Sequence, residues 1–260
     1  MSIELEAATR LVNLKQGIEA ATGETYPDIT DGVNALISGY GQGGEDDWAF
    51  VSSIIERNIA QLNNDKITVV GNSAFRECRN LTKVNLPNAT LIDMWCFNNC
   101  IVLKSVKLDK AKTINADAFL SCKELETAYL PYATGRLGYA SFMDCPKLKS
   151  VYIPMVTELD ANAFKASGLE FIDLPKCTRI NGGAFENCTQ LKTIVLRHSA
   201  VVSMGNVYVL NNTPFASNGE GGTVYVHAAL VESYKTATNW VTFYEGGKCN
   251  FVAIEGSEYE

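Results

Sequence analysis

The feature that most constrains the fold is a phenylalanine followed three residues later by a cysteine, which recurs along the middle of the chain. The pattern occurs six times at steps of 22, 22, 23, 22 and 21 residues, once with serine in place of cysteine. Its members are Phe75 with Cys78, Phe97 with Cys100, Phe119 with Cys122, Phe142 with Cys145, Phe164 with Ser167 and Phe185 with Cys188. A period in the low twenties held over six turns predicts a solenoid, so we expect function on a surface rather than in a central pocket.

Each repeat carries further apolar positions in constant register with the phenylalanine. Alternating pairs such as Val84 and Leu86 predict short strands with one face inward. Another apolar residue lies five positions before each phenylalanine, and we expect it to begin a second short strand. Because stacked coils lie about 4.7–4.9 Å apart, equivalent residues form ladders along the axis. The fifth coil departs from this register through Ser167 and a one-residue deletion before Leu169.

The cysteines fit the ladders better than they fit a chemical site. There are eight in 260 residues, well below the density of disulfide-built proteins, and seven of them fall at inner repeat positions. Zinc sites need close ligand pairs, and Cys96 and Cys100, which alone lie near each other, lack partner histidines. A disulfide between ladder neighbours requires a side chain to turn out of the packed row. Reduced structural thiols are therefore favoured over zinc and over disulfides, and no metal or cofactor is predicted.

Composition excludes several classes of function. The net charge of −7 without a Lys/Arg cluster argues against nucleic acid and anionic membrane surfaces. No run of 18 apolar residues occurs that predicts membrane insertion, and the acidic start of the chain is unlike a secretory signal peptide. The histidines, His198 and His227, belong to no catalytic motif. Glu158, Asp160 and Asp173 are the acids considered for glycoside hydrolysis, but no pattern singles them out, so a non-enzymatic protein is predicted.

With the repeat written as x-I-x-x-x-A-F-x-x-C-x-x-L-x-x-V-x-L-P, the chain resembles the BspA-like, or treponemal-type, leucine-rich repeat family over about residues 66–198. The resemblance implies an α/β-type repeat solenoid that is mainly β, right-handed and about six to seven coils long. It also implies attachment or ligand binding without catalytic residues. The stretch Thr223 to Val226, followed by residues 228–240, resembles the strand and helix that end such proteins. A terminal cap is required because the last coil otherwise exposes its apolar cross-section.

The N-terminal 38 residues predict two helices, over 4–22 and over 30–38, which bury too little surface to be stable alone. The segment G-E-T-Y-P-D-I-T-D-G-V-N-A-L-I resembles the attachment segments of tailed-bacteriophage structural proteins. That resemblance implies docking to other phage structural proteins through an apolar set of residues. The set is Leu11, Leu14, Ile18, Tyr26, Val33, Leu36 and Ile37.

Two functional hypotheses follow from these resemblances. The first is a virion protein of a tailed bacteriophage, assembled in the host cytoplasm as a tail, baseplate or capsid-attached fibre or decoration. Its solenoid would adhere to a host cell-surface glycan or protein, and it would be a homo-oligomer by analogy with other phage attachment proteins. The alternative is a bacterial cell-surface or secreted leucine-rich repeat adhesin.

Five segments are predicted along the chain. They are a helical attachment segment at 1–38, a Gly-rich linker at 39–47, a cap at 48–65, the solenoid at 66–198, and a last irregular coil with a C-terminal cap at 199–260. Apolar residues from Trp48 to Leu62 have helical spacing, so a helix is predicted over the first coil. The alternative is an extended segment from Ile59, which leads directly into the repeat.

Aromatic residues mark the candidate binding surface on an outward face that is otherwise mostly polar. Tyr129 and Tyr152 are ladder neighbours, Phe171 lies diagonally beside them, and Asp173 continues the tyrosine row. Aromatic rings beside a carboxylate are typical of sugar or peptide recognition, although a subunit contact or plain surface is also consistent with the pattern. A second patch lies on the turns before the phenylalanines. It comprises Met94, Trp95 and Tyr139.

Overall fold

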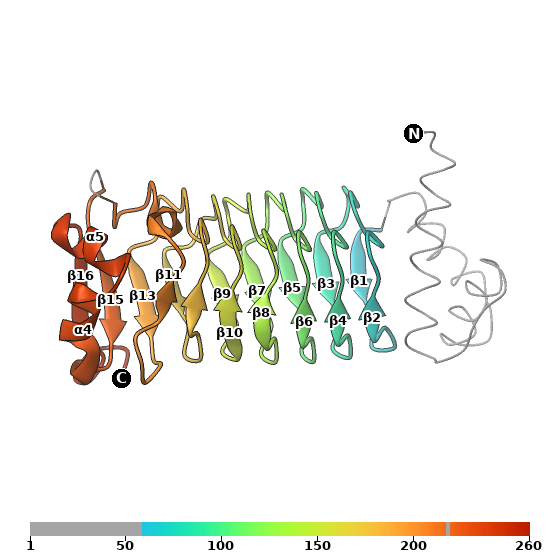
Figure 1. The fold of residues 1–260 in the computed structure, drawn as a ribbon. Helices are drawn as coiled ribbons and strands as arrows, with labels where there is room; N and C mark the ends of the chain where they lie inside the picture. Colours follow the sequence, from blue (N-terminus) through green and yellow to red (C-terminus); the bar gives the residue numbers. More distant parts are fainter. Residues whose placement is uncertain (1–58, 217–218) are drawn as a thin grey trace, which may run out of the picture.

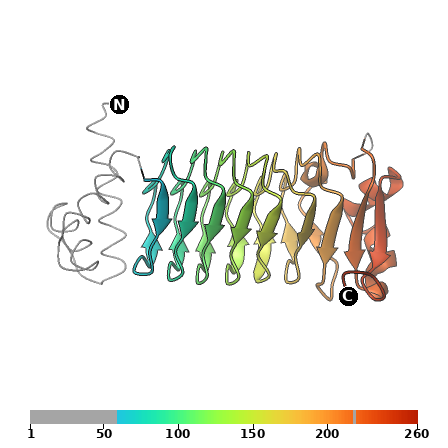
Figure 2. The ribbon, with the colours of Figure 1, turned by 180° about the vertical axis from the view of Figure 1, so that it is seen from behind.

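The computed structural model describes residues 59–216 and 219–260, which form a mainly parallel-β solenoid of about seven coils. Short strands repeat along an elongated rod, and the α-helices of this part lie at its C-terminal end (Figures 1 and 2). The predicted fold class is therefore confirmed. The predicted helices and docking residues of the segment 1–38, and the linker 39–47, lie outside the described residues.

The first row of strands runs the length of the rod and consists of two parallel sheets. The first sheet holds β1 (Gln61–Asn63), β3 (Lys83–Asn85), β5 (Ser105–Lys107), β7 (Thr127–Tyr129) and β9 (Ser150–Tyr152) in that order. The second holds β11 (Phe171–Asp173), β13 (Thr193–Leu196), β15 (Gly222–Val226) and β16 (Cys249–Ala253). Equivalent residues pair, as Val84 does with Val106 and Val106 with Ala128, so the predicted ladders exist. These central residues are buried, whereas most of their neighbours along each strand face outward.

The second row is built from strands of two to four residues. One sheet contains β2 (Val69–Val70), β4 (Leu91–Ile92) and β6 (Thr113–Ile114), and the next contains β8 (Gly135–Leu137), β10 (Val156–Leu159), β12 (Arg179–Ile180) and β14 (Ser203–Met204). The apolar residue five positions before each phenylalanine ends its strand, which corrects the prediction that it begins one. The reason is the turn that follows. Asn115 still donates to the carbonyl of Ile92 at 2.9 Å, but Asp117 already adopts a left-handed φ of 56°.

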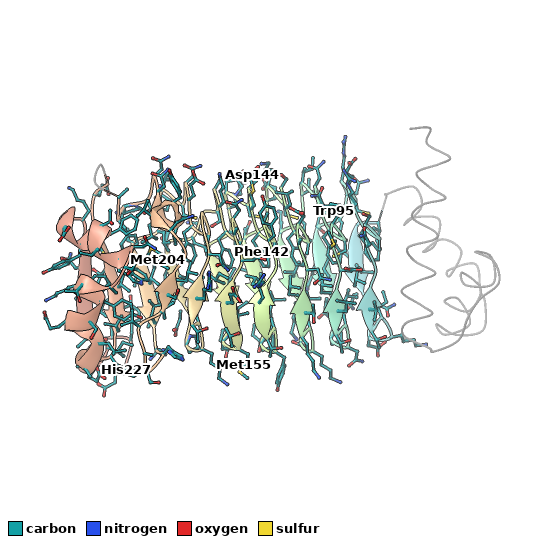
Figure 3. All side chains as sticks on the ribbon, in the orientation of Figure 1. Trp95, Phe142, Asp144, Met155, Met204 and His227 are labelled. Atoms are coloured by element: carbon teal, nitrogen blue, oxygen red, sulfur yellow. The ribbon has the colours of Figure 1, made fainter. Side chains whose placement is uncertain are left out.

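The phenylalanine ladder forms the centre of the core. Successive rings from Phe75 to Phe185 stack with centroids 5.0–5.7 Å apart and nearly parallel planes, and all six are buried. Figure 3 shows Phe142 among them. The leucine ladder beside it is likewise buried. The apolar interior thus continues through every coil, as nearest-neighbour stacking in a solenoid requires.

The cysteines have a second role in addition to filling space. Each of four ladder thiols donates a hydrogen bond to the backbone carbonyl of the phenylalanine in the preceding coil. The sulfur–oxygen distances are 3.1 Å for Cys100 to Phe75, 3.2 Å for Cys122 to Phe97, 3.3 Å for Cys145 to Phe119 and 3.0 Å for Cys188 to Phe164. All eight cysteines are buried free thiols, which agrees with the structural interpretation. Cysteine is suited here because it is small, largely apolar and still a weak donor.

The deletion in the fifth coil depends on a glycine. Gly168 donates its N–H to the carbonyl of Cys145 at 3.1 Å, and a Cβ atom on it would lie 2.1 Å from the carbonyl oxygen of Pro146. No side chain fits so close to the backbone, so the shorter coil needs glycine at this point. The ladder of β9 also ends here, and β11 begins the next sheet.

The described chain starts with a strand rather than a helix. Gln61, Leu62 and Asn63 form β1, and Leu62 pairs with Val84 of β3. The helical interpretation is therefore wrong at Leu62, where parallel pairing with the next coil outweighs the helical spacing, and the extended alternative is correct. Residues 48–58, which carry the rest of that predicted helix, lie outside the described residues.

At the C-terminal end the predicted strand is present, but several short helices take the place of the single predicted helix. After the 3-10 turn η1 (Val207–Leu210), the strand β15 includes the predicted residues 223–226. The helix predicted over 228–240 is divided into η2 (Ala228–Leu230), α4 (Val231–Thr236) and α5 (Trp240–Glu245). The break between α4 and α5 occurs where Ala237 is extended and Asn239 has a positive φ of 68°. Tyr234 and Trp240 are buried against the end of the core, and each bonds the backbone of Val202 at 2.8 Å. The helices thus cover the last coils.

Candidate functional site

A stacked pair of tyrosines stands out on the first row of strands. Tyr129 on β7 and Tyr152 on β9 are paired in register, and their ring centroids lie 5.2 Å apart with an interplanar angle of 8°. The side chains are 42% and 49% exposed, as expected for ladder neighbours on an outer face. Tyr132 follows in the turn after β7 and is exposed as well. The pair offers an aromatic surface whose position is fixed by the sheet.

The expected continuation of this patch through Phe171 and Asp173 is interrupted by other contacts. The ring of Phe171 stacks on Tyr259 with centroids 5.4 Å apart. Nε–H of Arg197 makes a bifurcated hydrogen bond to the two carboxylate oxygens of Asp173, at 3.2 and 3.1 Å. Tyr259 also meets the edge of Tyr225, so the C-terminal segment packs on the outer side of β11 and β15. The carboxylate predicted beside the tyrosines is therefore committed to an ion pair, which register alone could not show.

The second predicted patch is spread over separate coils. Trp95 donates from Nε1 to Oδ2 of Asp117 at 3.0 Å, and Asn162 donates from Nδ2 to the hydroxyl of Tyr139 at 3.1 Å. Burial raises the pKa of Asp117, an effect that the bond from Trp95 partly opposes. Met94 is partly buried beside Trp95 in its own turn. The two aromatic residues are thus held by polar partners in the following coil and form no joint surface.

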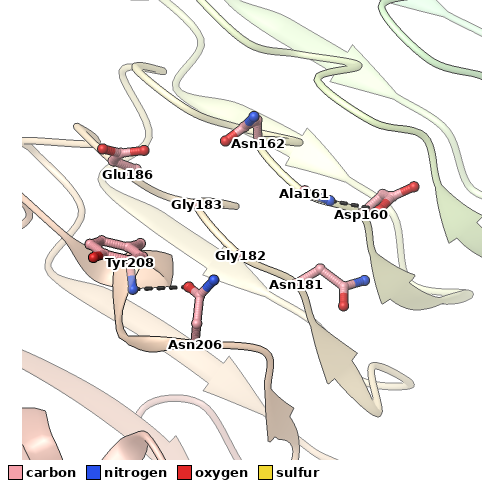
Figure 4. A pocket seen from close by; sticks show the side chains of 9 residues that line it. All are labelled: Asp160, Ala161, Asn162, Asn181, Gly182, Gly183, Glu186, Asn206 and Tyr208. Carbon is pink, nitrogen blue, oxygen red and sulfur yellow. Dashed lines mark hydrogen bonds between the residues drawn. The ribbon is translucent and has the colours of Figure 1, made fainter.

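A hollow that sequence reasoning missed lies further along the same turns (Figure 4). It has a volume of about 500 Å³ and is a shallow depression, widely open to solvent. Its lining is Asp160, Ala161, Asn162, Asn181, Gly182, Gly183, Glu186, Asn206 and Tyr208. The available signal was Gly182-Gly183, a glycine pair where the other repeats carry side chains. Asn206 and Tyr208 could not be assigned to the same place because they belong to the irregular coil.

The acids considered for hydrolysis are ion-paired. Glu158 lies 3.3 Å from Arg136 and 3.7 Å from Arg179, and Asp160 lies 3.5 Å from Arg136. Such ion pairs are ordinary features of a protein surface. Within residues 59–216 and 219–260, no group of three or more His, Cys, Asp or Glu side chains is arranged to hold a metal ion.

Burial makes the ladder thiols unsuitable as nucleophiles. It raises the pKa of Cys145 and of Cys177 to about 12 and that of Cys188 to about 11. The pKa values of Cys96 and Cys122 are raised by the same cause. Since the thiolate is the reactive form, these residues stay protonated and inert at neutral pH.

Parallel strands in two rows, a phenylalanine and leucine core and one coil every 21 to 23 residues define a leucine-rich repeat solenoid. The sequence model of the BspA type leucine-rich repeat region matches residues 49–170 and 157–216 in six copies, so the chain belongs to this family. Proteins of such repeat families typically bind partners without catalysis.

Two solved structures share similarity with the chain. A leucine rich cell surface protein from Faecalibacterium prausnitzii A2-165 is 28% identical, with a TM-score of 0.47 over 54% of this chain. A leucine-rich repeat protein from Bacteroides ovatus is 18% identical, with a TM-score of 0.38 over 78% of this chain. The alignments span 38% and 65% of the length of those two proteins. No curated protein matches the sequence. Among the described residues, no helix has the length and apolar character to span a membrane.

Proposed function

We propose that this chain is a non-enzymatic, adhesin-like binding module whose solenoid contacts a cell-surface ligand through Tyr129 and Tyr152. The observation that carries the proposal is the stacked and exposed tyrosine pair on a rigid parallel sheet. Family membership supports a binding role, since it covers the solenoid that presents the pair. The ion-paired acids and buried thiols give no support to catalysis.

The pair has the properties of a recognition surface. Each ring has two rotatable side-chain bonds, and the stack holds both rings in place, so little side-chain freedom remains to be lost on binding. Tyrosine combines an apolar face with a hydroxyl group, which suits contacts with a glycan or with a protein. Lys107, the preceding residue of this ladder row, is paired with Asp109 at 3.2 Å. The lysine next to the rings is therefore neutralised by its own ion pair.

The test is the binding of fluorescently labelled protein to a panel of epithelial and bacterial cells, measured by flow cytometry. Replacing both Tyr129 and Tyr152 with alanine should lower binding at least about tenfold, because hot-spot aromatics carry much of the affinity of such contacts. The matched control is Tyr244→Ala, which removes an exposed tyrosine from the C-terminal cap. Unchanged binding by the double variant, with an unchanged melting temperature, would refute the proposed surface. Periodate or protease treatment of the cells then distinguishes a glycan ligand from a protein ligand.

The same pair has a second proposed role as a subunit contact, because aromatic residues are enriched at interfaces between chains. Sedimentation velocity separates the two. If the native chain is an oligomer that dissociates in the Tyr129→Ala, Tyr152→Ala variant, the pair lies between subunits. If the oligomeric state does not change while cell binding is lost, the pair contacts the ligand.

We propose display on a bacterial cell surface in preference to a phage particle. The family match covers residues 49–216, which carry the adhesin interpretation, whereas the phage interpretation depends on residues 1–38 and their docking set. Immunoblots of fractionated cells and of purified phage particles test the choice. Presence in particles at a fixed stoichiometry would restore the virion hypothesis.

A further inference from the structure

The hollow at Gly182 and Gly183 arises from a local break in the side-chain ladders. In the coil before, the equivalent turn positions hold Ala161 and Asn162. A Cβ atom on Gly182 would lie 2.4 Å from Nδ2 of Asn206, and one on Gly183 would lie 2.4 Å from Oδ1 of Asn162. The missing side chains thus bring amide groups from two flanking coils to the edges of one depression.

Amide groups of both polarities face this space. Asn162 donates to Tyr139 through Nδ2, which directs its Oδ1 toward Gly183. Asn206 accepts from the backbone N–H of Tyr208 through Oδ1 at 3.0 Å, which leaves Nδ2 beside Gly182. In the part of the chain that the structure describes, no hydrogen bond involves Nδ2 of Asn206. One acceptor and one donor are therefore available on opposite sides of the glycine pair (Figure 4).

The two carboxylates of the hollow are balanced by cations behind them. Asp160 lies 3.5 Å from Arg136, and Glu186 lies 2.7 Å from Lys165. Neither cation lines the hollow, whose walls therefore carry little net charge. Oδ1 of Asp160 accepts from the backbone N–H of Ala161 at 2.8 Å and its Oδ2 faces Arg136, so the acceptor that the carboxylates offer is Oε1 of Glu186. Anions are disfavoured by the acids, and the ion pairs weaken the attraction for cations. The electrostatics favour a neutral ligand with many hydroxyl groups.

An aromatic ring completes the site. Tyr208 is 61% exposed, the largest exposed fraction among the large hydrophobic residues of the described part, and stands at the rim on η1. Asn206 caps this 3-10 turn and so fixes the backbone of Tyr208. An exposed ring face beside convergent amides and carboxylates matches the two kinds of surface on a sugar, its apolar C–H face and its hydroxyl edge. The volume lies within the range of small-molecule sites, about 300–1,000 Å³.

From these features we propose that the hollow is a binding site for a neutral oligosaccharide. Tyr208 stacks on the face of one pyranose ring, while Glu186 and Asn162 accept hydrogen bonds from its hydroxyls and Asn206 donates one. The site is separate from the Tyr129/Tyr152 pair, which lies on the first row of strands, and it does not depend on the proposed function.

The test uses the full chain and saturation-transfer NMR, followed by calorimetric titration with each sugar that gives a signal. The probes are maltotriose, cellotriose, mannotriose, chitotriose and lactose, with sialyllactose as an anionic comparison, spermidine as a cationic one and calcium chloride as a metal one. We expect at least one neutral sugar to bind with a dissociation constant below about 10 mM, the weak end of measurable affinity. Binding of spermidine, sialyllactose or calcium with no neutral sugar would overturn the assignment, as would no binding at all.

Two variants tie that binding to the hollow. Tyr208→Ala removes the stacking ring. Gly183→Asn adds a side chain at the ladder position that Asn162 occupies in the preceding coil, where Asn162 adopts a left-handed φ of 59°. Asparagine tolerates this backbone, and its Cβ would displace Oδ1 of Asn162, the far end of a side chain, so Gly183→Asn should fold but remove that acceptor from the hollow. Each of the two variants should lower the affinity for the neutral sugar at least about tenfold. The control Tyr132→Ala, which removes a residue 59% exposed, should bind within about twofold of the native chain.

Three results decide the assignment. Native-like affinity in both Tyr208→Ala and Gly183→Asn places the sugar elsewhere and refutes the proposal. The Tyr129→Ala, Tyr152→Ala variant should retain the sugar, because its rings do not line the hollow. Loss of the sugar in that variant, with Tyr208→Ala still binding, would assign it to the tyrosine pair instead.

Discussion

The ring of Tyr259 stacks on the ring of Phe171 with centroids 5.4 Å apart, and this contact joins the C-terminal segment to β11. Aromatic pairs contribute about 0.5–1.5 kcal/mol beyond the area they bury. A double-mutant cycle with Tyr259→Ala and Phe171→Ala should therefore give a coupling of about that size in the free energy of unfolding. Urea denaturation followed by circular dichroism measures it.

A second cycle serves as the control for this contact. Tyr259→Ala combined with Tyr129→Ala should be additive, because Tyr129 stacks on Tyr152 instead. Additivity in the first cycle as well would show that Tyr259 leaves the surface of β11 in solution.

The phenylalanine ladder predicts large effects from single truncations. Phe119 is buried between Phe97 and Phe142, with ring centroids 5.3 and 5.0 Å away. Phe119→Ala should lower the free energy of unfolding by about 3–5 kcal/mol, through lost burial and the cavity left in the stack. Chemical denaturation is the measurement. Tyr132→Ala, at an exposed position outside the stacked pairs, should cost less than about 1 kcal/mol, and equal costs would contradict the assignment of inner and outer positions.

The thiols should react only after unfolding. Burial raises the pKa of Cys249, as of Cys145, to about 12, so little thiolate forms at neutral pH and the sulfur atoms are covered. Iodoacetamide at pH 7.5 should leave the native chain almost unlabelled, and mass spectrometry after denaturation without reductant should show eight adducts. Six adducts or fewer under those conditions would indicate a disulfide.

The C-terminal region should lose stability as the pH rises. Nδ1 of His227 lies 3.0 Å from Oε1 of Glu255 and Nε2 lies 2.9 Å from the carbonyl of Arg197. The hydrogen bond to Glu255, followed by that to Arg197, raises the pKa of His227 above its ordinary 6.5. The folded state thus holds the proton more tightly, so this stabilisation is complete below about pH 6.5 and is lost as the pH passes the folded value.

Glu255 sets the lower end of the pH range in which its pair with His227 stabilises the folded state. Its own backbone N–H, and then His227, lower its pKa below 4.5, so its contribution is present above that value and is lost toward lower pH. An NMR titration of His227 should show a midpoint above 6.5, and His227→Gln should remove the corresponding pH dependence of the melting temperature. A midpoint at or below 6.5 would contradict the paired geometry.

The repeat residues could be placed from sequence because their environment is repeated with them. Phe97, Leu103 and Cys100 are each followed by a residue of their own type at the equivalent position of the next coil. One register therefore assigns all the members of a ladder to the interior. The same argument put Tyr129 beside Tyr152. Outside the six phenylalanine repeats prediction became less accurate, as in the helical interpretation of Leu62, which in fact continues the strand ladder, and the undivided helix expected over 228–240.

By itself, then, the sequence determined the solenoid, its inner ladders and the outward direction of the tyrosines, since periodic spacing fixes which face each residue occupies. Only the tertiary structure decided the use of that surface. It paired Asp173 with Arg197, placed Tyr259 on Phe171, and brought Asn206 and Tyr208 of the irregular coil to the gap at Gly182 and Gly183. The contacts of Tyr259, Asn206 and Tyr208 involve segments outside the repeat, and the pairing of Asp173 depends on where the side chain of Arg197 turns after β13. They depend on how the chain returns in three dimensions, which a repeat pattern does not encode.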